Sequence, residues 1–180
     1  AGSSSAGHSH ELPTTEIATM PANADAMPDL AARELMLTRV LRAPRHNVWR
    51  CWTEPALVVQ WFTPPPWKTV AAEMDVRRGG TSLIVMRGPE GQEMPNPGVY
   101  LDVVPDERLV FTDAFVRAWV PSNKAFMTGE LTFADEGRDT RYTARVWHWS
   151  VQDREAHEQM GFHQGWGIAT DQLEALAATL

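Results

Sequence analysis

The hydrophobic pattern of this chain changes its period near residue 150. Upstream, short segments in which apolar and polar residues alternate are separated by turn residues, which is typical of β-strands. Downstream, apolar residues from Phe162 to Leu180 recur at steps of three and four, as on one face of a helix. We therefore predict an uninterrupted helix over residues 153–179, which at 1.5 Å per residue would be roughly 40 Å long.

Seven segments are predicted as strands from their alternation and their apolar and β-branched residues. They cover residues 34–42, 67–77, 81–87, 98–104, 109–116, 126–133 and 141–149. Short connections with Gly, Pro, Asn or Asp separate the later strands, so we expect an antiparallel meander. Alternation predicts that one face of residues 67–77 carries Val70, Ala72, Met74 and Val76.

Two short helices are predicted between the first two strands. Pro44 suits the first turn of a helix with Val48, Trp49, Cys51 and Trp52 on its apolar side. Residues 53–55 end this helix and start a second one, which the prolines at 64–66 terminate. We expect Cys51 to be a buried apolar filler.

These elements predict an α+β fold. A curved antiparallel sheet of six to seven strands would wrap around the long C-terminal helix, with the two short helices after the first strand closing one end. One helix cannot fill the whole width of such a sheet, so an internal pocket is expected. We assign residues 33–180 to this single ligand-binding domain.

Residues 1–32 have a different composition and are predicted to be a flexible tail. They are rich in Gly, Ser, Ala, Pro and Thr and hold no aromatic residue. For the first dozen residues, which do not begin with Met, a cloning remnant is an open alternative. His8 and His10 lie on this segment, where two histidines do not make a metal site.

Composition argues against several classes of partner. The net charge is −7 and the 16 Lys and Arg residues are scattered, which does not favour nucleic acid binding. No apolar run reaches about 18 residues, so no membrane span is expected. A single cysteine excludes an internal disulfide, and no signal-peptide pattern opens the chain. We expect a cytoplasmic protein without a cofactor or a metal.

Aromatic residues predict the pocket walls. The chain has eight Trp, a number that fits half-buried walls as well as a solid core. Trp61, Phe62 and Trp67 flank the proline run, where they either cap the core or form a lip over the pocket. The predicted ligand-binding residues are Trp61, Phe62, Met74, Phe111, Met127, Tyr142, His148, Phe162 and Trp166.

His148 is the candidate polar residue of the pocket. It follows Tyr142, Ala144 and Val146 at steps of two, so it should face inward with them. It is interpreted as a hydrogen-bonded core residue, a polar anchor for a ligand, or a general base. The sequence holds no known nucleophile or zinc motif. Asp113 would face inward only if the strand over residues 109–116 had the opposite register to the one that Leu109 and Phe111 indicate. His157 and His163 are six residues apart, so they lie on different faces of a helix and do not suit a metal pair.

Gly161 and Gly165 lie one turn apart within the predicted helix, where each costs about 1 kcal/mol relative to Ala. One explanation is close packing of the helix on the sheet. The other is that the missing side chains leave room for a ligand beside Phe162 and Trp166. Both explanations stay open at this stage.

Several motifs in residues 34–180 resemble the Hsp90-ATPase-activator-like family of the START/Bet v 1-like helix-grip superfamily. Residues 161–166 (G-F-H-Q-G-W) are similar to the family's G-M-x-x-G-W at the start of its C-terminal helix. The other matching pieces are residues 41–44 with 48–49 and 52–53, 61–64, 78–80, 86–91, 98–100 and 109–113. Phe162 replaces the usual Met, and Phe62-Thr63 replaces the common Trp-Gly.

This resemblance implies a helix-grip fold and a binder of small hydrophobic molecules, aromatic ones included, of a stress or antibiotic-resistance type. Binding or sequestration in an internal cavity is therefore the expected function. A cyclase- or hydrolase-type enzyme that uses His148 is the first alternative, and a cofactor of an Hsp90-type chaperone is the second. A homodimer is compatible with the sequence.

Overall fold

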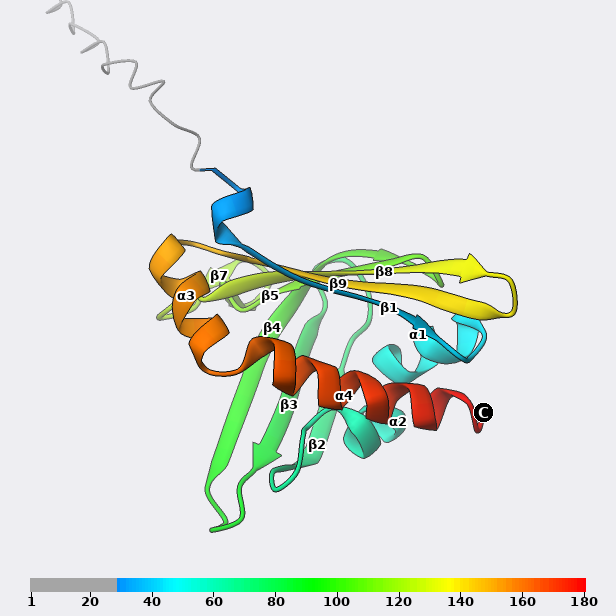
Figure 1. The fold of residues 1–180 in the computed structure, drawn as a ribbon. Helices are drawn as coiled ribbons and strands as arrows, with labels where there is room; N and C mark the ends of the chain where they lie inside the picture. Colours follow the sequence, from blue (N-terminus) through cyan, green and yellow to red (C-terminus); the bar gives the residue numbers. More distant parts are fainter. Residues whose placement is uncertain (1–28) are drawn as a thin grey trace, which may run out of the picture.

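The computed structural model describes residues 29–180 (Figure 1). The tail predicted for residues 1–32 therefore falls, up to residue 28, outside the described residues. The described part opens with a short 3-10 helix, η1 (Ala31–Arg33), which leads directly into the first strand. None of the helices in residues 29–180 is long and apolar enough to cross a membrane.

Seven strands form one antiparallel sheet in the order β1-β9-β8-β5-β4-β3-β2. The fold class and the expected number of strands are confirmed. A separate two-stranded hairpin, β6 (Phe115–Arg117) and β7 (Val120–Pro121), follows β5. The strands of the main sheet are β1 (Glu34–Leu41), β2 (Lys68–Met74), β3 (Thr81–Arg87), β4 (Glu93–Val104), β5 (Arg108–Thr112), β8 (Met127–Glu136) and β9 (Asp139–His148).

The second strand departs from simple alternation. Thr69 pairs with Met86 but Ala71 pairs with Val85, so an extra residue is inserted at Val70. Val70 is consequently 38% exposed, and the prediction that it shares a face with Ala72 and Met74 is wrong. A bulge reverses the side-chain alternation beyond it, and its position depends on the partner strand.

The fourth strand begins earlier than predicted, at Glu93 instead of residue 98. Its first half contains Pro95 and Pro97, and proline is disfavoured inside a strand because it cannot donate to a ladder. In this half β4 pairs with β3 alone, since its pairing with β5 begins at Val99. Prolines are tolerated where one side of a strand has no partner.

The predicted C-terminal helix is divided in two. Helix α3 (Val151–Gln159) and helix α4 (Phe162–Ala177) are separated at Gly161, whose φ of 94° is left-handed. A left-handed residue cannot continue a helix, so the prediction of one unbroken helix over residues 153–179 is wrong. Helix α3 begins two residues before the predicted start, and it is capped by Ser150, whose hydroxyl accepts a hydrogen bond from the Asp153 N–H at 3.0 Å.

The two short helices are α1 (Arg45–Thr53) and α2 (Pro55–Trp61), as predicted. The Trp61 indole N–H donates to the carbonyl oxygen of Cys51 at 2.8 Å and ties the helices together. Cys51 is completely buried, and burial raises the pKa of its thiol to about 11. Its expected place as an apolar filler in the core is therefore confirmed.

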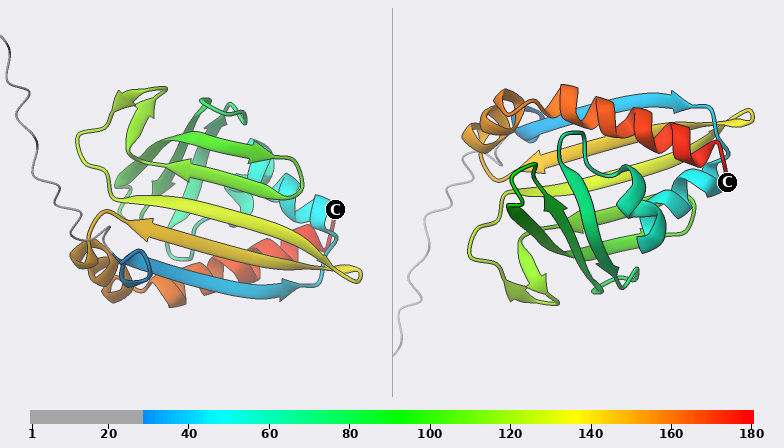
Figure 2. Two further views of the ribbon diagram at one scale, coloured as in Figure 1. Left: turned by 90° about the horizontal axis from the view of Figure 1, so that it is seen from above. Right: turned by 90° about the horizontal axis from the view of Figure 1, so that it is seen from below.

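Helix α4 crosses the concave face of the sheet, with α1 and α2 near its C-terminal end and α3 at the other end (Figures 1 and 2). It packs against β1, α1 and α2. The core lies along this contact and includes Leu41, Trp52, Tyr142 and Leu173. The curved remainder of the sheet, from β5 to β2, extends beyond the helix (Figure 2).

Candidate functional site

Two adjoining cavities, each partly open to solvent, lie on the side of the sheet that faces the helices. Their volumes are about 440 Å³ and about 360 Å³. We call them cavity 1 and cavity 2. Their shared lining consists of Trp52, Phe62, Asn96 and Met127. The concave surface is thus incompletely filled, as the predicted pocket required.

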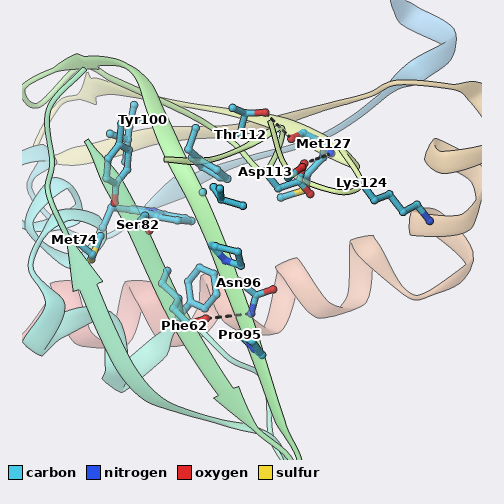
Figure 3. Close-up of a pocket in the computed structure, with 18 of the residues that line it drawn as sticks. Phe62, Met74, Ser82, Pro95, Asn96, Tyr100, Thr112, Asp113, Lys124 and Met127 are labelled. Atoms are coloured by element: carbon cyan, nitrogen blue, oxygen red, sulfur yellow. Dashed lines mark hydrogen bonds between the residues drawn. The ribbon is translucent and has the colours of Figure 1, made fainter. Parts of the chain in front are cut away.

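Cavity 1 lies against β3, β4 and β5 (Figure 3). Its apolar wall combines strand residues such as Ile84 and Phe111 with Phe62 from the end of α2. The polar members of the lining come mostly from one rim, at the end of β5 and the loop before β8. The polar residues of this rim are Thr112, Asp113, Ser122, Asn123 and Lys124.

Asp113 organises this rim. Its Oδ1 accepts hydrogen bonds from the backbone N–H groups of Phe126 at 2.8 Å and Met127 at 3.1 Å. Asp113 follows the last residue of β5, so the alternation of that strand does not govern its direction. Its carboxylate is held by the loop, and its side chain also contributes to the lining of cavity 1 (Figure 3).

Trp52 separates the two cavities at the centre of an aromatic cluster. Its ring stacks on Phe111 and Tyr142 at centroid distances of 6.2 and 6.5 Å, and meets Trp61 edge-on at 4.7 Å. The indole N–H of Trp52 is buried next to the Tyr142 side chain. The cluster therefore presents mainly apolar ring surface to both cavities.

Two tyrosines add hydroxyl groups to this wall. Burial raises the pKa of Tyr100 to about 12 and raises the pKa of Tyr142 further above its ordinary value. Both phenols are consequently neutral at physiological pH, and each can donate a hydrogen bond. Tyr100 lines cavity 1 and Tyr142 lines cavity 2.

Cavity 2 lies beside the junction of α3 and α4. Phe162, Gly165, Trp166 and Ala169 of α4 contribute to its lining. A Cβ built on Gly165 would meet no atom within 4 Å, so close packing does not explain this glycine. The missing side chain leaves space, as in the second explanation above. Gly161 has a different cause, because its left-handed backbone separates the two helices.

His148 is fully buried but lines neither cavity. Its Nδ1 lies 3.0 Å from the Arg33 carbonyl oxygen, and its Nε2 lies 2.9 Å from Nδ1 of His157. The prediction that His148 lines the ligand pocket is therefore wrong. Helix α3 folds back over β9, so that His157 lies between His148 and cavity 2. The other eight predicted residues line one cavity or both: Trp61, Phe62, Met74, Phe111, Met127, Tyr142, Phe162 and Trp166.

His157 is the histidine that lines cavity 2. Burial, with a smaller contribution from His148, lowers its pKa to about 4, so this imidazole is neutral at physiological pH. His163 is exposed instead, 3.6 Å from a carboxylate oxygen of Glu158. Within residues 29–180 no three His, Cys, Asp or Glu side chains converge in a way that could hold a metal ion.

Sequence analysis missed several lining residues. Trp52 was placed on the apolar side of α1 but not in the pocket, although a large ring at a helix end near the sheet could have suggested it. Asn96 lies in the proline-containing half of β4, outside the predicted strand over residues 98–104. His157 was considered only as a partner for His163, and no local signal indicates its contact with His148.

Solved structures of similar fold come from several bacteria. Protein NE0264 from Nitrosomonas europaea is 42% identical, with a TM-score of 0.79 over 81% of this chain and 94% of that one. Protein CV1439 from Chromobacterium violaceum is 25% identical, with a TM-score of 0.66 over 79% and 96%. Protein Ms6760 from Mycobacterium smegmatis, at 23% identity and a TM-score of 0.70 over 84% and 94%, shares the fold.

Comparison with curated protein sequences finds no match. The family described as Activator of Hsp90 ATPase homolog 1-like protein matches residues 42–178, which is most of the chain and nearly all of the described part. The matched segment contains the two short helices, all strands except β1, and the C-terminal helices. This chain therefore belongs to the family of Activator of Hsp90 ATPase homolog 1-like proteins.

Proposed function

We propose that the protein binds a small hydrophobic molecule in the cavities on the concave side of the sheet. The observation that carries this proposal is the pair of adjoining cavities, because a fold that only needed a core would fill them with side chains. Each cavity lies within the range of about 300–1,000 Å³ that is typical of small-molecule sites. An aromatic ligand would match the rings of Trp52, Phe62 and Phe111.

A fluorescent apolar probe, N-phenyl-1-naphthylamine, tests this proposal directly. Its emission should rise on binding, and the protein should melt at a higher temperature in its presence. Ligand at 100 times its Kd is expected to stabilise the folded protein by about 2.7 kcal/mol. Absence of both effects, across naphthalene-sized and fatty-acid-sized compounds, would remove the proposal.

Two matched pairs of variants identify the cavity that is used. Gly165→Leu adds a side chain where space is open in cavity 2, whereas Gln164→Leu adds the same side chain at the exposed neighbouring position. Ser82→Leu and its exposed neighbour Thr81→Leu form the equivalent pair for cavity 1. Loss of probe binding in one lining variant but not in its control would place the ligand. Unchanged binding in all four would overturn the internal site.

The other functional interpretations stay predictions. A cyclase- or hydrolase-type reaction that uses His148 would need an acid beside it, whereas its ring contacts the Arg33 carbonyl oxygen and His157. A role with an Hsp90-type chaperone, a stress or resistance role, a homodimer and a cytoplasmic location follow from sequence and family resemblance alone.

A further inference from the structure

A chain of three polar groups runs from the N-terminal end of β1 to cavity 2. It begins at the carbonyl oxygen of Arg33, which lies 3.0 Å from Nδ1 of His148. The other ring nitrogen of His148, Nε2, lies 2.9 Å from Nδ1 of His157. His157 is the member that lines the cavity. The order of the groups determines where the protons lie.

A carbonyl oxygen can only accept a hydrogen bond, so Nδ1 of His148 must carry a proton. A neutral imidazole has one N–H, which leaves Nε2 of His148 as an acceptor. Nδ1 of His157 must then donate to it. Nε2 of His157, the nitrogen at the end of the chain, is left without a proton and with a free lone pair.

This assignment holds for the neutral imidazole of His148, and the geometry of the described residues places no anionic partner against its ring. The side chain is completely buried, where a charge without a partner is costly. The guanidinium of Arg33 donates to the carbonyl oxygen of His148 itself at 2.9 Å, so the nearby charge is positive as well. Among the described residues, neither imidazole hydrogen-bonds with a carboxylate.

Nε2 of His157 is left without a hydrogen-bond partner among the described residues. The ring of His157 is surrounded by aromatic side chains, with the centroids of Phe126 and Phe162 at 5.2 and 5.1 Å. Nε2 is not fully buried, so water can donate to it in the free protein. A ligand that fills this part of cavity 2 displaces that water, and it keeps the acceptor satisfied only if it brings a donor of its own.

We propose that Nε2 of His157 accepts a hydrogen bond from a hydroxyl group of the molecule held in cavity 2, so that the ligand class is a hydroxylated aromatic compound. This proposal rests on the proposed function and adds the polarity of the ligand. Cavity 2 selects a hydrogen-bond donor at its α3 end. Aromatic character follows from the nearby rings of Phe162 and Trp166, which are 5.2 Å apart between centroids. A neutral His157 is consistent with its half-buried position beside these rings.

Three probes of one ring system test the selection: 2-naphthol, 2-methoxynaphthalene and naphthalene. The wild-type protein should bind 2-naphthol about fivefold more tightly than 2-methoxynaphthalene, which has the same oxygen but no proton to donate. The variant His157→Phe keeps a planar ring and should bind both compounds equally, with its affinity for naphthalene retained. Equal affinities in the wild type, or an undiminished preference in the variant, would overturn the proposal.

Nitrogen chemical shifts of the ring atoms at neutral pH provide a second measurement that needs no ligand and no variant. Both His148 and His157 should be the Nδ1–H form, with Nε2 of His157 unprotonated. A proton on Nε2 of His157 would refute the assignment on its own. If naphthalene binds but 2-naphthol has no advantage, only this inference fails, whereas no binding of any of the three counts against the proposed function.

Discussion

The N–H group of Gly165 donates to the carbonyl oxygen of Gly161 at 2.7 Å, yet these two glycines have opposite backbone requirements. Gly161 has a left-handed φ of 94° and separates α3 from α4, whereas Gly165 lies inside α4. A Cβ would meet no atom within 4 Å at either position. The pair therefore separates the effect of backbone conformation from the effect of packing.

Substitution by alanine should change stability in opposite directions at these two sites. Gly165→Ala should raise the free energy of unfolding by about 0.5–1 kcal/mol, because glycine is unfavourable inside a helix. Gly161→Ala should lower it by about 1–2 kcal/mol, because a Cβ is strained in the left-handed region. Urea unfolding of both variants checks the signs. A loss of stability in Gly165→Ala would mean that the open space has a structural role.

Much of the architecture was predictable because it depends on local periodicity. The steps of two from Tyr142 to His148 correctly placed four side chains inside, and the change of period near residue 150 correctly marked where strands give way to helix. These patterns are properties of a few neighbouring residues. The fold class needed only their order along the chain.

The features that escaped prediction depend on contacts between distant segments. The bulge at Val70 is set by pairing with β3, and the extension of β4 through Pro95 depends on which of its edges has a partner. The contact between His148 and His157 exists because the chain reverses between β9 and α3. No spacing rule within one element describes such a pair, so its part in the candidate site could not be read from the sequence.

Gly129 of β8 provides a prediction about the wall of cavity 1. A Cβ at this position would lie 2.5 Å from Cζ of Phe111, so the glycine allows the Phe111 ring to lie over the neighbouring strand. Gly129→Ala should displace this ring and cost about 1–3 kcal/mol of stability, as overpacking commonly does. Phe111→Leu should relieve the clash. A double-mutant cycle by urea unfolding measures this coupling, and additive losses would contradict the explanation.

Helix α3 is expected to be the least stable element around cavity 2. None of its residues is buried, and its N-terminus depends on the hydrogen bonds between Ser150 and Asp153. Ser150→Ala should cost about 1 kcal/mol and raise amide hydrogen exchange in α3 more than in α4. Ser150→Asn keeps a capping group and should retain most of the protection. A uniform rise in exchange across both helices would show that α3 does not open separately.

Acid should destabilise the protein through His157. Burial lowers the pKa of His157 from 6.5 to about 4 in the folded protein, so between these values the unfolded chain binds a proton that the folded chain does not. Stability is therefore present above pH 6.5 and is lost as the pH falls toward 4. Discounted for the partial exposure of the ring, this loss is on the order of 1–2 kcal/mol.

His157→Gln cannot titrate but can still donate to Nε2 of His148, so its free energy of unfolding should fall less over the same range. Thermal unfolding of both proteins at pH 7.0, 5.5 and 4.0 provides the comparison, and parallel curves would place the acid sensitivity at other groups.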